Sequence, residues 1–269
     1  MSIITISRAS CSDGQALADL VAERLGYRCL GSEALIEAAA TYGVAEPKLS
    51  QAFEEVPSFW ERLTQSRHQY LSIIQAAMCD QALEGALVYH GQAGQQLLKG
   101  ISHVLKVRLI APLAYRLKIA MEQLGVNRET ALQHLQQADE EQFQRMRYLF
   151  NVDWQDPTLY DLVLNLEHMR LETAADVVVY MAQHADYQPT PVSEKTLHEL
   201  TLSCRVRASL AVRGADVETR ADGSIVWVTG RVPSYEAKFE ALRVAQAVPG
   251  VNEVISEIEV TATAPYPTM

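Results

Sequence analysis

Short apolar segments alternate with longer helical patterns over residues 1–185, and this alternation constrains the fold more than any other feature of the chain. Between the apolar segments, hydrophobic residues recur three and four positions apart, as in the run that stops at Gly26. Strands that alternate with helices predict an α/β fold whose parallel sheet carries helices on both faces. The predicted strands are Ile3–Ser7, Tyr27–Leu30, Ala86–His90, His103–Leu109 and Leu162–Asn165, and the predicted long helices are Ser50–Leu83 and Pro112–Leu149, the latter interrupted at 125–127.

Prolines and small polar residues interrupt the helical pattern at 186–195, which we interpret as a linker. Residues 196–260 follow a different rhythm and predict a compact α+β unit, with a short tail at 261–269. Its predicted elements are a helix over Thr196–Val212, strands over Asp216–Thr219 and Ile225–Val232, a helix from Ser234 to Val248 and a last strand over Val251–Val260.

Charge and composition exclude several classes of protein. The 33 Asp and Glu residues outnumber the 23 Lys and Arg residues, so the net charge is −10. This balance argues against a protein that binds duplex nucleic acid through a basic face. The chain has no apolar run of about 20 residues and no export signal, so we expect a cytoplasmic protein. Four cysteines without a CxxC pair and seven histidines without metal spacing predict reduced thiols and no protein metal site.

A polar turn follows the first strand and leads directly into a helix. Such a turn can bind an anion, because successive backbone N–H groups and the helix dipole point toward a bound phosphate. The turn from Arg8 to Gln15 lacks the G-x-x-x-x-G-K-[ST] pattern of a specific phosphate loop. From the pattern alone, an ordinary strand-to-helix turn is an equal interpretation.

Several motifs in order along the chain resemble the cytidylate kinase-like family, over about residues 1–185. The first is Ile4-Thr-Ile-Ser-Arg followed by Cys11-Ser-Asp-Gly-Gln and a helix that ends in Leu25-Gly-Tyr. The others are Val88-Tyr-His-Gly-Gln-Ala-Gly, Ile110-Ala-Pro-Leu-Ala-Tyr-Arg, Asp139-Glu-Glu-Gln and Val152-Asp-Trp-Gln-Asp-Pro-Thr-Leu-Tyr-Asp-Leu-Val-Leu-Asn.

This resemblance implies a phosphate-loop domain of the nucleoside monophosphate kinase type, which would bind ATP or another nucleotide with Mg²⁺. It also implies an acceptor pocket over the strand ends and a lid that supplies arginines. The residues that would touch the reacting phosphates are Arg8, Arg116, Asp139, Arg145 and Arg147. Those that would bind the nucleotide are Ser10, Cys11, Ser12, Asp13, Gly14, Gln15 and Gln92.

The chain departs from the family pattern mainly where a positive charge is expected. Glutamine stands at three basic positions, namely Gln15, Gln92 and Gln142. In addition, Cys11 and Asp13 stand where the family favours glycine, and Gly31 where it often has aspartate. Because phosphoryl transfer depends on cations that offset the moving charge, we expect a binding or sensing module with weak transfer. The alternatives are an active ATP-dependent kinase of a nucleotide or small metabolite, in which the remaining arginines and Mg²⁺ compensate, and a scaffold that binds no nucleotide.

Each of these residues also has a purely structural interpretation. Arg8 and Arg116 could tie helices together, and Arg145, Arg147 and Asp139 could lie on a solvated helix face. A serine just before a helix, such as Ser12, is as often a helix cap as a phosphate or Mg²⁺ ligand. His90, at a strand end, is more often structural than an acid or base.

The segment from Ile225 to Ser256 resembles a BON domain, over about residues 196–260. The resemblance rests on Ile225-Val-Trp-Val-Thr-Gly-Arg-Val and on Ala241-Leu-Arg-Val-Ala-Gln-Ala-Val-Pro-Gly-Val. It implies a lipid or protein partner, and self-association into a homo-oligomer through the sheet is an equal interpretation. The acidic charge balance weighs against anionic lipid surfaces, which favour basic patches.

Overall fold

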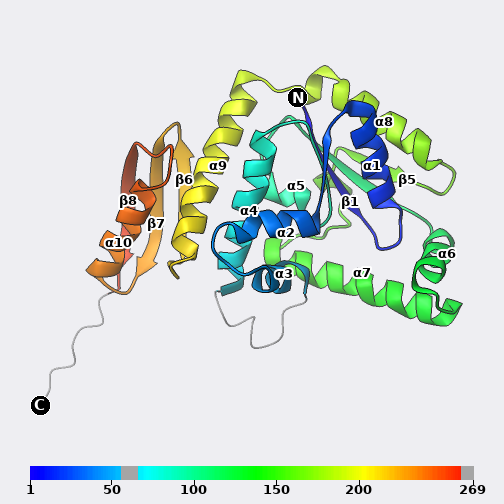
Figure 1. The fold of residues 1–269 in the computed structure, drawn as a ribbon, viewed down its shortest axis with the longest axis horizontal. Coiled ribbons are helices and arrows are strands. Elements are labelled where there is room, and N and C mark those ends of the chain that lie inside the picture. Colours follow the sequence, from blue (N-terminus) through cyan, green and yellow to red (C-terminus); the bar gives the residue numbers. More distant parts are fainter. Residues whose placement is uncertain (56–65, 262–269) are drawn as a thin grey trace, which may run out of the picture.

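Residues 1–55 and 66–187 form a five-stranded parallel sheet and the helices that cover it, as the alternating pattern predicts (Figure 1). The computed structural model describes residues 1–55 and 66–261. Part of the predicted helix over Ser50–Leu83 and most of the predicted tail, residues 56–65 and 262–269, lie outside the described residues. The strands are β1 (Ile3–Arg8), β2 (Arg28–Gly31), β3 (Leu87–His90), β4 (Val104–Ile110) and β5 (Leu162–Asn165), in the order β2-β3-β1-β4-β5.

Side chains of the central strand β1 are buried alternately in two apolar cores, because successive side chains of a strand point to opposite faces of the sheet. Ile4 and Ile6 are buried under α1 (Gly14–Leu25) and α8 (Leu171–Gln183). Ile3 is buried on the other face. The other helices that contribute to that second core are α2 (Ser32–Ala40), α3 (Glu46–Glu54), α4 (Ser66–Leu83), α5 (Gly94–Leu97), α7 (Arg128–Phe150) and α9 (Pro191–Ala211).

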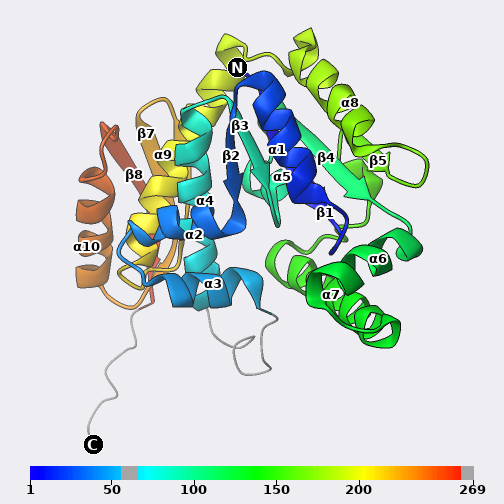
Figure 2. The same ribbon diagram turned by 45° about the vertical axis from the view of Figure 1, so that its right-hand side comes forward.

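The predicted interruption of the long helix over Pro112–Leu149 is confirmed. Helix α6 (Leu113–Leu124) ends at Gly125, whose left-handed backbone has a φ of 65°, close to the 66° of Gly26 at the end of α1. Asn127 then caps α7 by accepting a hydrogen bond from the Thr130 backbone. The two helices form an arm beside the strand ends (Figure 2). A single-turn helix η2 (Pro157–Leu159) precedes β5.

The second unit is a three-stranded sheet covered by helices. Its elements are β6 (Val217–Asp222), β7 (Ile225–Val232), α10 (Tyr235–Gln246) and β8 (Glu253–Val260). Strand β7 pairs antiparallel with β6 and parallel with β8. Ser234 caps α10, as the sequence predicts.

Helix α9 begins at Pro191, inside the segment interpreted as a linker. The reason is a capping box, in which Thr190 and Ser193 bond reciprocally, and it extends the helix back from the predicted start at Thr196. The short helix η3 (Ala185–Tyr187) also falls partly within that segment.

Helix α9 lies between the two units and belongs to both cores (Figures 1 and 2). One side buries Leu197, Cys204 and Ala208 in the core of the first unit. The other side buries Val206 and Leu210 in the core of the second. A single rigid helix therefore joins the two units mechanically.

Candidate functional site: the strand ends

The loop between β1 and α1 adopts the left-handed backbone that glycine prefers. Cys11 and Asp13 both have a φ of 54°, a conformation that costs about 1–2 kcal/mol for a residue with a side chain. These are the two positions at which the resemblance predicts glycine. The backbone therefore keeps a conformation that the side chains disfavour.

Polar side chains of this loop are engaged within the protein. The buried Ser12 hydroxyl donates to the Ala9 carbonyl at 2.7 Å. The Tyr115 hydroxyl donates to Asp13 Oδ2 at 2.6 Å. Asp13, not Ser12, occupies the helix cap position, and its side chain makes no cap hydrogen bond. In this arrangement neither side chain is presented to a phosphate or to Mg²⁺.

Gly14 is required where α1 begins, because the Arg8 side chain packs directly against it. A Cβ at residue 14 would lie 2.0 Å from Arg8 Cδ, far closer than atoms approach. The neighbouring Gln15 is exposed. The absence of a side chain at Gly14 thus leaves space for Arg8 at the start of the helix, and Gln15 faces solvent.

A polar cavity of about 150 Å³ lies where β1, β2 and β3 end. In open parallel sheets, ligands bind in such crevices outside the carboxyl ends of the strands. The lining residues are Arg8, Ser10, Ser32, Glu33, Glu54, His90, Gly91, Gln92, Gln142 and Arg145.

Two buried nitrogen atoms in this cavity have no hydrogen-bond partner among the described residues: Arg8 Nε and His90 Nδ1. Buried polar atoms are normally paired, and these two are exceptions among the described residues. Arg145 Nε donates to Gln92 Oε1 at 2.9 Å, and Gln142 Nε2 donates to the Arg8 carbonyl at 3.4 Å. The glutamines therefore position the arginines and the loop.

The cavity keeps its histidine neutral. Burial lowers the pKa of His90 below its ordinary value of 6.5, and the charge of Arg8 lowers it further, while Asp19 and Glu33 act in the opposite direction. A Cβ at Gly31 would lie 3.1 Å from Glu33 Oε2 and 3.2 Å from the His90 ring, so a side chain there would require these neighbours to shift slightly.

Arg116 and Asp139 bind each other beside the loop. The Arg116 Nη1 and Nη2 atoms donate to the two Asp139 carboxylate oxygens at 2.8 and 2.7 Å. Arg116 Nε donates to the Ser10 carbonyl at 2.8 Å. Through these hydrogen bonds the pair links the loop to α6 and α7.

The structure brings some of the predicted site residues together and separates others. Arg8, Ser10, Gln92 and Arg145 meet at the cavity, whereas Arg147 is exposed and lies 6.0 Å from the Phe143 ring. Cys11, Ser12, Asp13, Gly14 and Gln15 form the adjoining loop and the first turn of α1.

The sequence interpretation missed Ser32, Glu33 and Glu54. Ser32 and Glu33 directly follow the second strand, so their position at a strand end was a usable signal. Glu54 carries no such signal.

The cavity suits a phosphate group better than the loop suits Mg²⁺. Arg8 and Arg145 can donate hydrogen bonds to phosphate oxygens, while Glu33 and Glu54 line the same cavity and offset their charge. Within residues 1–55 and 66–261, no group of three or more His, Cys, Asp or Glu side chains is close enough to hold a metal ion. In the same ranges, no helix combines the length and apolar character needed to cross a membrane.

One solved structure with a TM-score above 0.5 supports the fold, and two others align less closely. An uncharacterized protein from Eubacterium ventriosum aligns with a TM-score of 0.53 and 18% identity, over 67% of this chain and 97% of its own. Shikimate kinase from Bacteroides thetaiotaomicron aligns with a TM-score of 0.42 and 10% identity, over 68% of this chain and 99% of its own. Shikimate kinase from Acinetobacter baumannii, solved with shikimate, gives 0.39 and 14%, over 67% and 92%. No curated protein matches the chain.

Two family models match the chain, and each matched range corresponds to one of the two units of the structure. The BON domain model matches residues 201–262, which include the three-stranded sheet. The model of the cytidylate kinase-like family matches residues 3–168, more than half of the chain, including all five strands of the parallel sheet. The chain is therefore a member of the cytidylate kinase-like family that also carries a BON domain.

Proposed function

We propose that this protein binds a nucleotide or another phosphorylated small molecule at the strand-end cavity and transfers phosphoryl groups poorly. The observation that carries this proposal is the cavity's charge pattern. Arg8 and Arg145 line it together with Gln92 and Gln142, which stand where the family has basic residues. A cavity of this kind retains anion-binding groups while it lacks the full set of cations.

The loss of positive charges weakens catalysis more than it weakens ligand binding. Removal of one electrostatic donor costs about 2.7–4 kcal/mol of transition-state stabilisation in enzymes that have been studied by mutation. Glutamine keeps a hydrogen-bond donor but not the charge, so replacements at Gln15, Gln92 and Gln142 lower a transfer rate by orders of magnitude. Ground-state binding needs fewer charges, and two arginines suffice for one phosphate group.

The size of the cavity limits what it encloses. Its volume of about 150 Å³ is smaller than the roughly 300–1,000 Å³ of pockets that enclose a whole drug-sized ligand. A phosphate group fits inside, and the remainder of a nucleotide would extend beyond the cavity. Arg8 lines the cavity, and its guanidinium group can donate hydrogen bonds to a phosphate.

Helix α9 supports a sensing role that involves the BON domain. Its two sides are packed into the cores of both units, so a shift of one core would displace a helix that the other core shares. We propose that ligand occupancy is passed along this route to a BON partner. The cytoplasm is the proposed location of both events.

Calorimetric titration of the full chain with ATP, ADP, CMP and pyrophosphate, with and without Mg²⁺, tests the binding proposal. We expect Arg8→Gln and Arg145→Gln to weaken binding about tenfold each, the loss expected when one charged contact is removed. Arg147→Gln is the matched control, because Arg147 lies two residues from Arg145 on an exposed position. Absence of binding, or equal losses in Arg145→Gln and Arg147→Gln, would overturn the proposal.

A coupled assay of ADP production with nucleoside monophosphates or small metabolites as acceptors tests the second half of the proposal. We expect turnover orders of magnitude below the roughly 1–100 s⁻¹ of kinases. Turnover within that range would establish the active phosphotransferase instead. Loss of that turnover in Arg8→Gln would then locate it at this cavity.

A further inference from the structure

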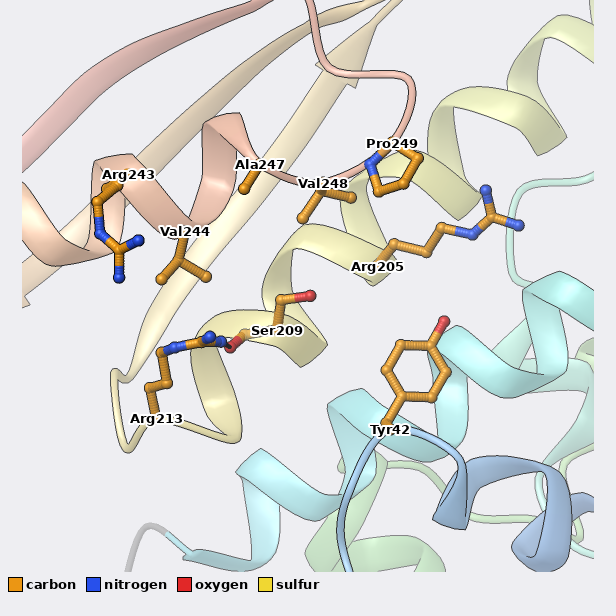
Figure 3. A pocket seen from close by; sticks show the side chains of 9 residues that line it. All are labelled: Tyr42, Arg205, Ser209, Arg213, Arg243, Val244, Ala247, Val248 and Pro249. Carbon is orange, nitrogen blue, oxygen red and sulfur yellow. Dashed lines mark hydrogen bonds between the residues drawn. The ribbon is translucent and has the colours of Figure 1, made fainter.

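A second and larger cleft lies between the two units, away from the strand ends. Its volume is about 530 Å³, and its walls come from α9, from α10 and from the loop that contains Tyr42 (Figure 3). The lining residues are Tyr42, Arg205, Ser209, Arg213, Arg243, Val244, Ala247, Val248 and Pro249. Ligand sites occur preferentially at such boundaries between domains and have volumes in this range.

Hydrogen-bond donors form a stripe along one side of this cleft. Arg205 and Ser209 are four residues apart on α9, so they lie on one face of that helix. Arg213 lies two residues beyond Ala211, the last residue of α9, and also lines the cleft. Arg243 of α10 lies opposite Arg213, and both guanidinium groups face the same part of the cleft (Figure 3).

The cleft holds more positive than negative charge. Asp80 neutralises Arg205, whose Nε donates to Oδ1 at 2.7 Å, and it also accepts from the Tyr42 hydroxyl at 2.6 Å. Glu240 is shared: Arg243 Nη2 lies 2.7 Å from it and Arg213 Nε 3.8 Å. The three arginines thus have two carboxylates, which leaves one positive charge uncompensated on a chain whose net charge is −10.

The uncompensated charge is located at the pair of Arg213 and Arg243. Two guanidinium groups provide about ten N–H donors, and the single Glu240 carboxylate can accept only about four hydrogen bonds. Both arginine side chains are at least half exposed. Their remaining donors are accessible to an anion from the cleft.

The facing wall is apolar. Val244, Ala247, Val248 and Pro249 lie along the end of α10 and the turn that follows it (Figure 3). Of these, Val244 and Val248 belong to the core of the second unit, so their positions are held by packing. A ligand that fills this cleft therefore needs both an anionic group and an apolar body.

We infer that this interdomain cleft binds a small phosphate monoester with an apolar body, whose phosphate contacts Arg213 and Arg243 and whose body packs on Val244 and Val248. Arginine forks pair with phosphate oxygens in a bidentate manner, and the one positive charge that Glu240 leaves uncompensated on this arginine pair attracts a phosphate anion. This inference does not depend on the proposed function of the strand-end cavity.

Fluorescence and calorimetric titration of the full chain with 1-naphthyl phosphate tests the inference. We expect binding at this cleft to weaken at least about tenfold in the double variant Arg213→Gln/Arg243→Gln, since two charged contacts are lost. Arg231→Gln is the matched control, because Arg231 is an exposed arginine of the same unit that pairs with Glu259. Arg8→Gln separates the cleft from the strand-end cavity. 1-Naphthol tests the need for the phosphate, and inorganic phosphate tests the need for the apolar body.

The inference is supported if only the double variant loses binding and if both simpler probes bind at least about tenfold more weakly than the ester. Circular dichroism of each variant checks that the fold is retained. Binding that survives in the double variant, or that is lost in Arg8→Gln, overturns it. A further arm uses vesicles with and without phosphatidylglycerol: arginine-dependent binding to the anionic vesicles without binding of the free ester also overturns it.

Discussion

Arg116 and Asp139 bind each other through two parallel hydrogen bonds of 2.8 and 2.7 Å, which join α6 to α7 beside the strand-end loop. The Arg116 side chain is 10% exposed and that of Asp139 is 31% exposed. Both residues are candidates for contact with phosphates on the strength of family resemblance. In this structure, each satisfies the charge of the other, and Arg116 also holds the Ser10 carbonyl.

The first prediction concerns this ion pair. We expect Arg116→Met to lower the free energy of unfolding by about 2–3 kcal/mol, somewhat less than the roughly 3–5 for a fully buried pair. The cause is the Asp139 carboxylate, which loses its partner. The double variant Arg116→Met/Asp139→Leu should recover part of that loss, because it leaves no uncompensated charge. Urea unfolding of the two single variants and the double variant gives the coupling energy, and strictly additive losses would contradict this account.

The second prediction concerns the left-handed backbone at Cys11, where φ is 54°. Alanine and glycine both remove the thiol, but only glycine removes the conformational penalty. We expect Cys11→Gly to be more stable than Cys11→Ala by about 1 kcal/mol, because the relief of strain is partly offset by the entropy of glycine. Urea denaturation of the two variants measures the difference. Equal stabilities would show that the loop conformation carries no such penalty.

The third prediction follows from the lowered pKa of His90. The unfolded chain takes up a proton near pH 6.5, whereas the folded chain does so only at lower pH. Between these values the unfolded state binds more protons, so the free energy of unfolding falls as the pH is lowered from 7 through 6.5. We expect His90→Asn to reduce this slope. Urea unfolding at pH values between 5 and 8 measures it.

His103 provides the comparison for that experiment. Burial also lowers the pKa of His103, and the nearby N-terminal charge adds to the effect. His103→Asn should therefore reduce the same slope, and the two substitutions together should reduce it further. A slope that neither substitution changes would contradict the assignment to these histidines.

The fourth prediction restores a charge to the strand-end cavity. Gln92→Arg places a third guanidinium beside Arg145, whose Nε lies 2.9 Å from the present Gln92 oxygen. We expect pyrophosphate binding to strengthen about tenfold, as for one added charge-assisted contact, while the free protein loses about 1 kcal/mol of stability through repulsion. Titration and urea unfolding measure the two effects. Gln144→Arg is the control, since Gln144 pairs with Glu140 along the helix surface, and an equal gain there would refute a local cause.

The fifth prediction concerns the contact between the two units. Asp80 of α4 accepts hydrogen bonds from Arg205 of α9 and from Tyr42. We expect Asp80→Asn to lower the free energy of unfolding by about 1–2 kcal/mol, because two hydrogen bonds lose their charged acceptor. Asp222→Asn is the control, because its pair with Lys195 is exposed and should contribute less to stability. Similar losses in both variants would contradict a special role of Asp80.

Much of the fold follows from local patterns. Alternating apolar residues locate each of the five parallel strands within one or two residues of its observed bounds, and Gly26 marks the end of α1. Helix α9 is an exception at its start, since the capping box of Thr190 and Ser193 outweighs the proline-rich appearance of the segment.

The candidate site was predictable only in part. The motif order identifies Arg8, Gln92 and Arg145, which the structure brings to one cavity. It also groups Arg147 with them, although that side chain is exposed. Glu54 was missed because its approach to the cavity depends on the way α3 packs, which no local pattern specifies.

The amino-acid order alone determined the strands, several helix boundaries and the two family memberships, because hydrophobic periodicity and turn residues act over a few neighbouring positions. Tertiary structure alone decided which charges compensate one another between elements. It paired Arg116 with Asp139, brought Arg213 Nε within 3.8 Å of Glu240, and left Arg8 Nε without a partner among the described residues. Such pairings join elements distant in sequence, and their geometry depends on how helices and strands pack together.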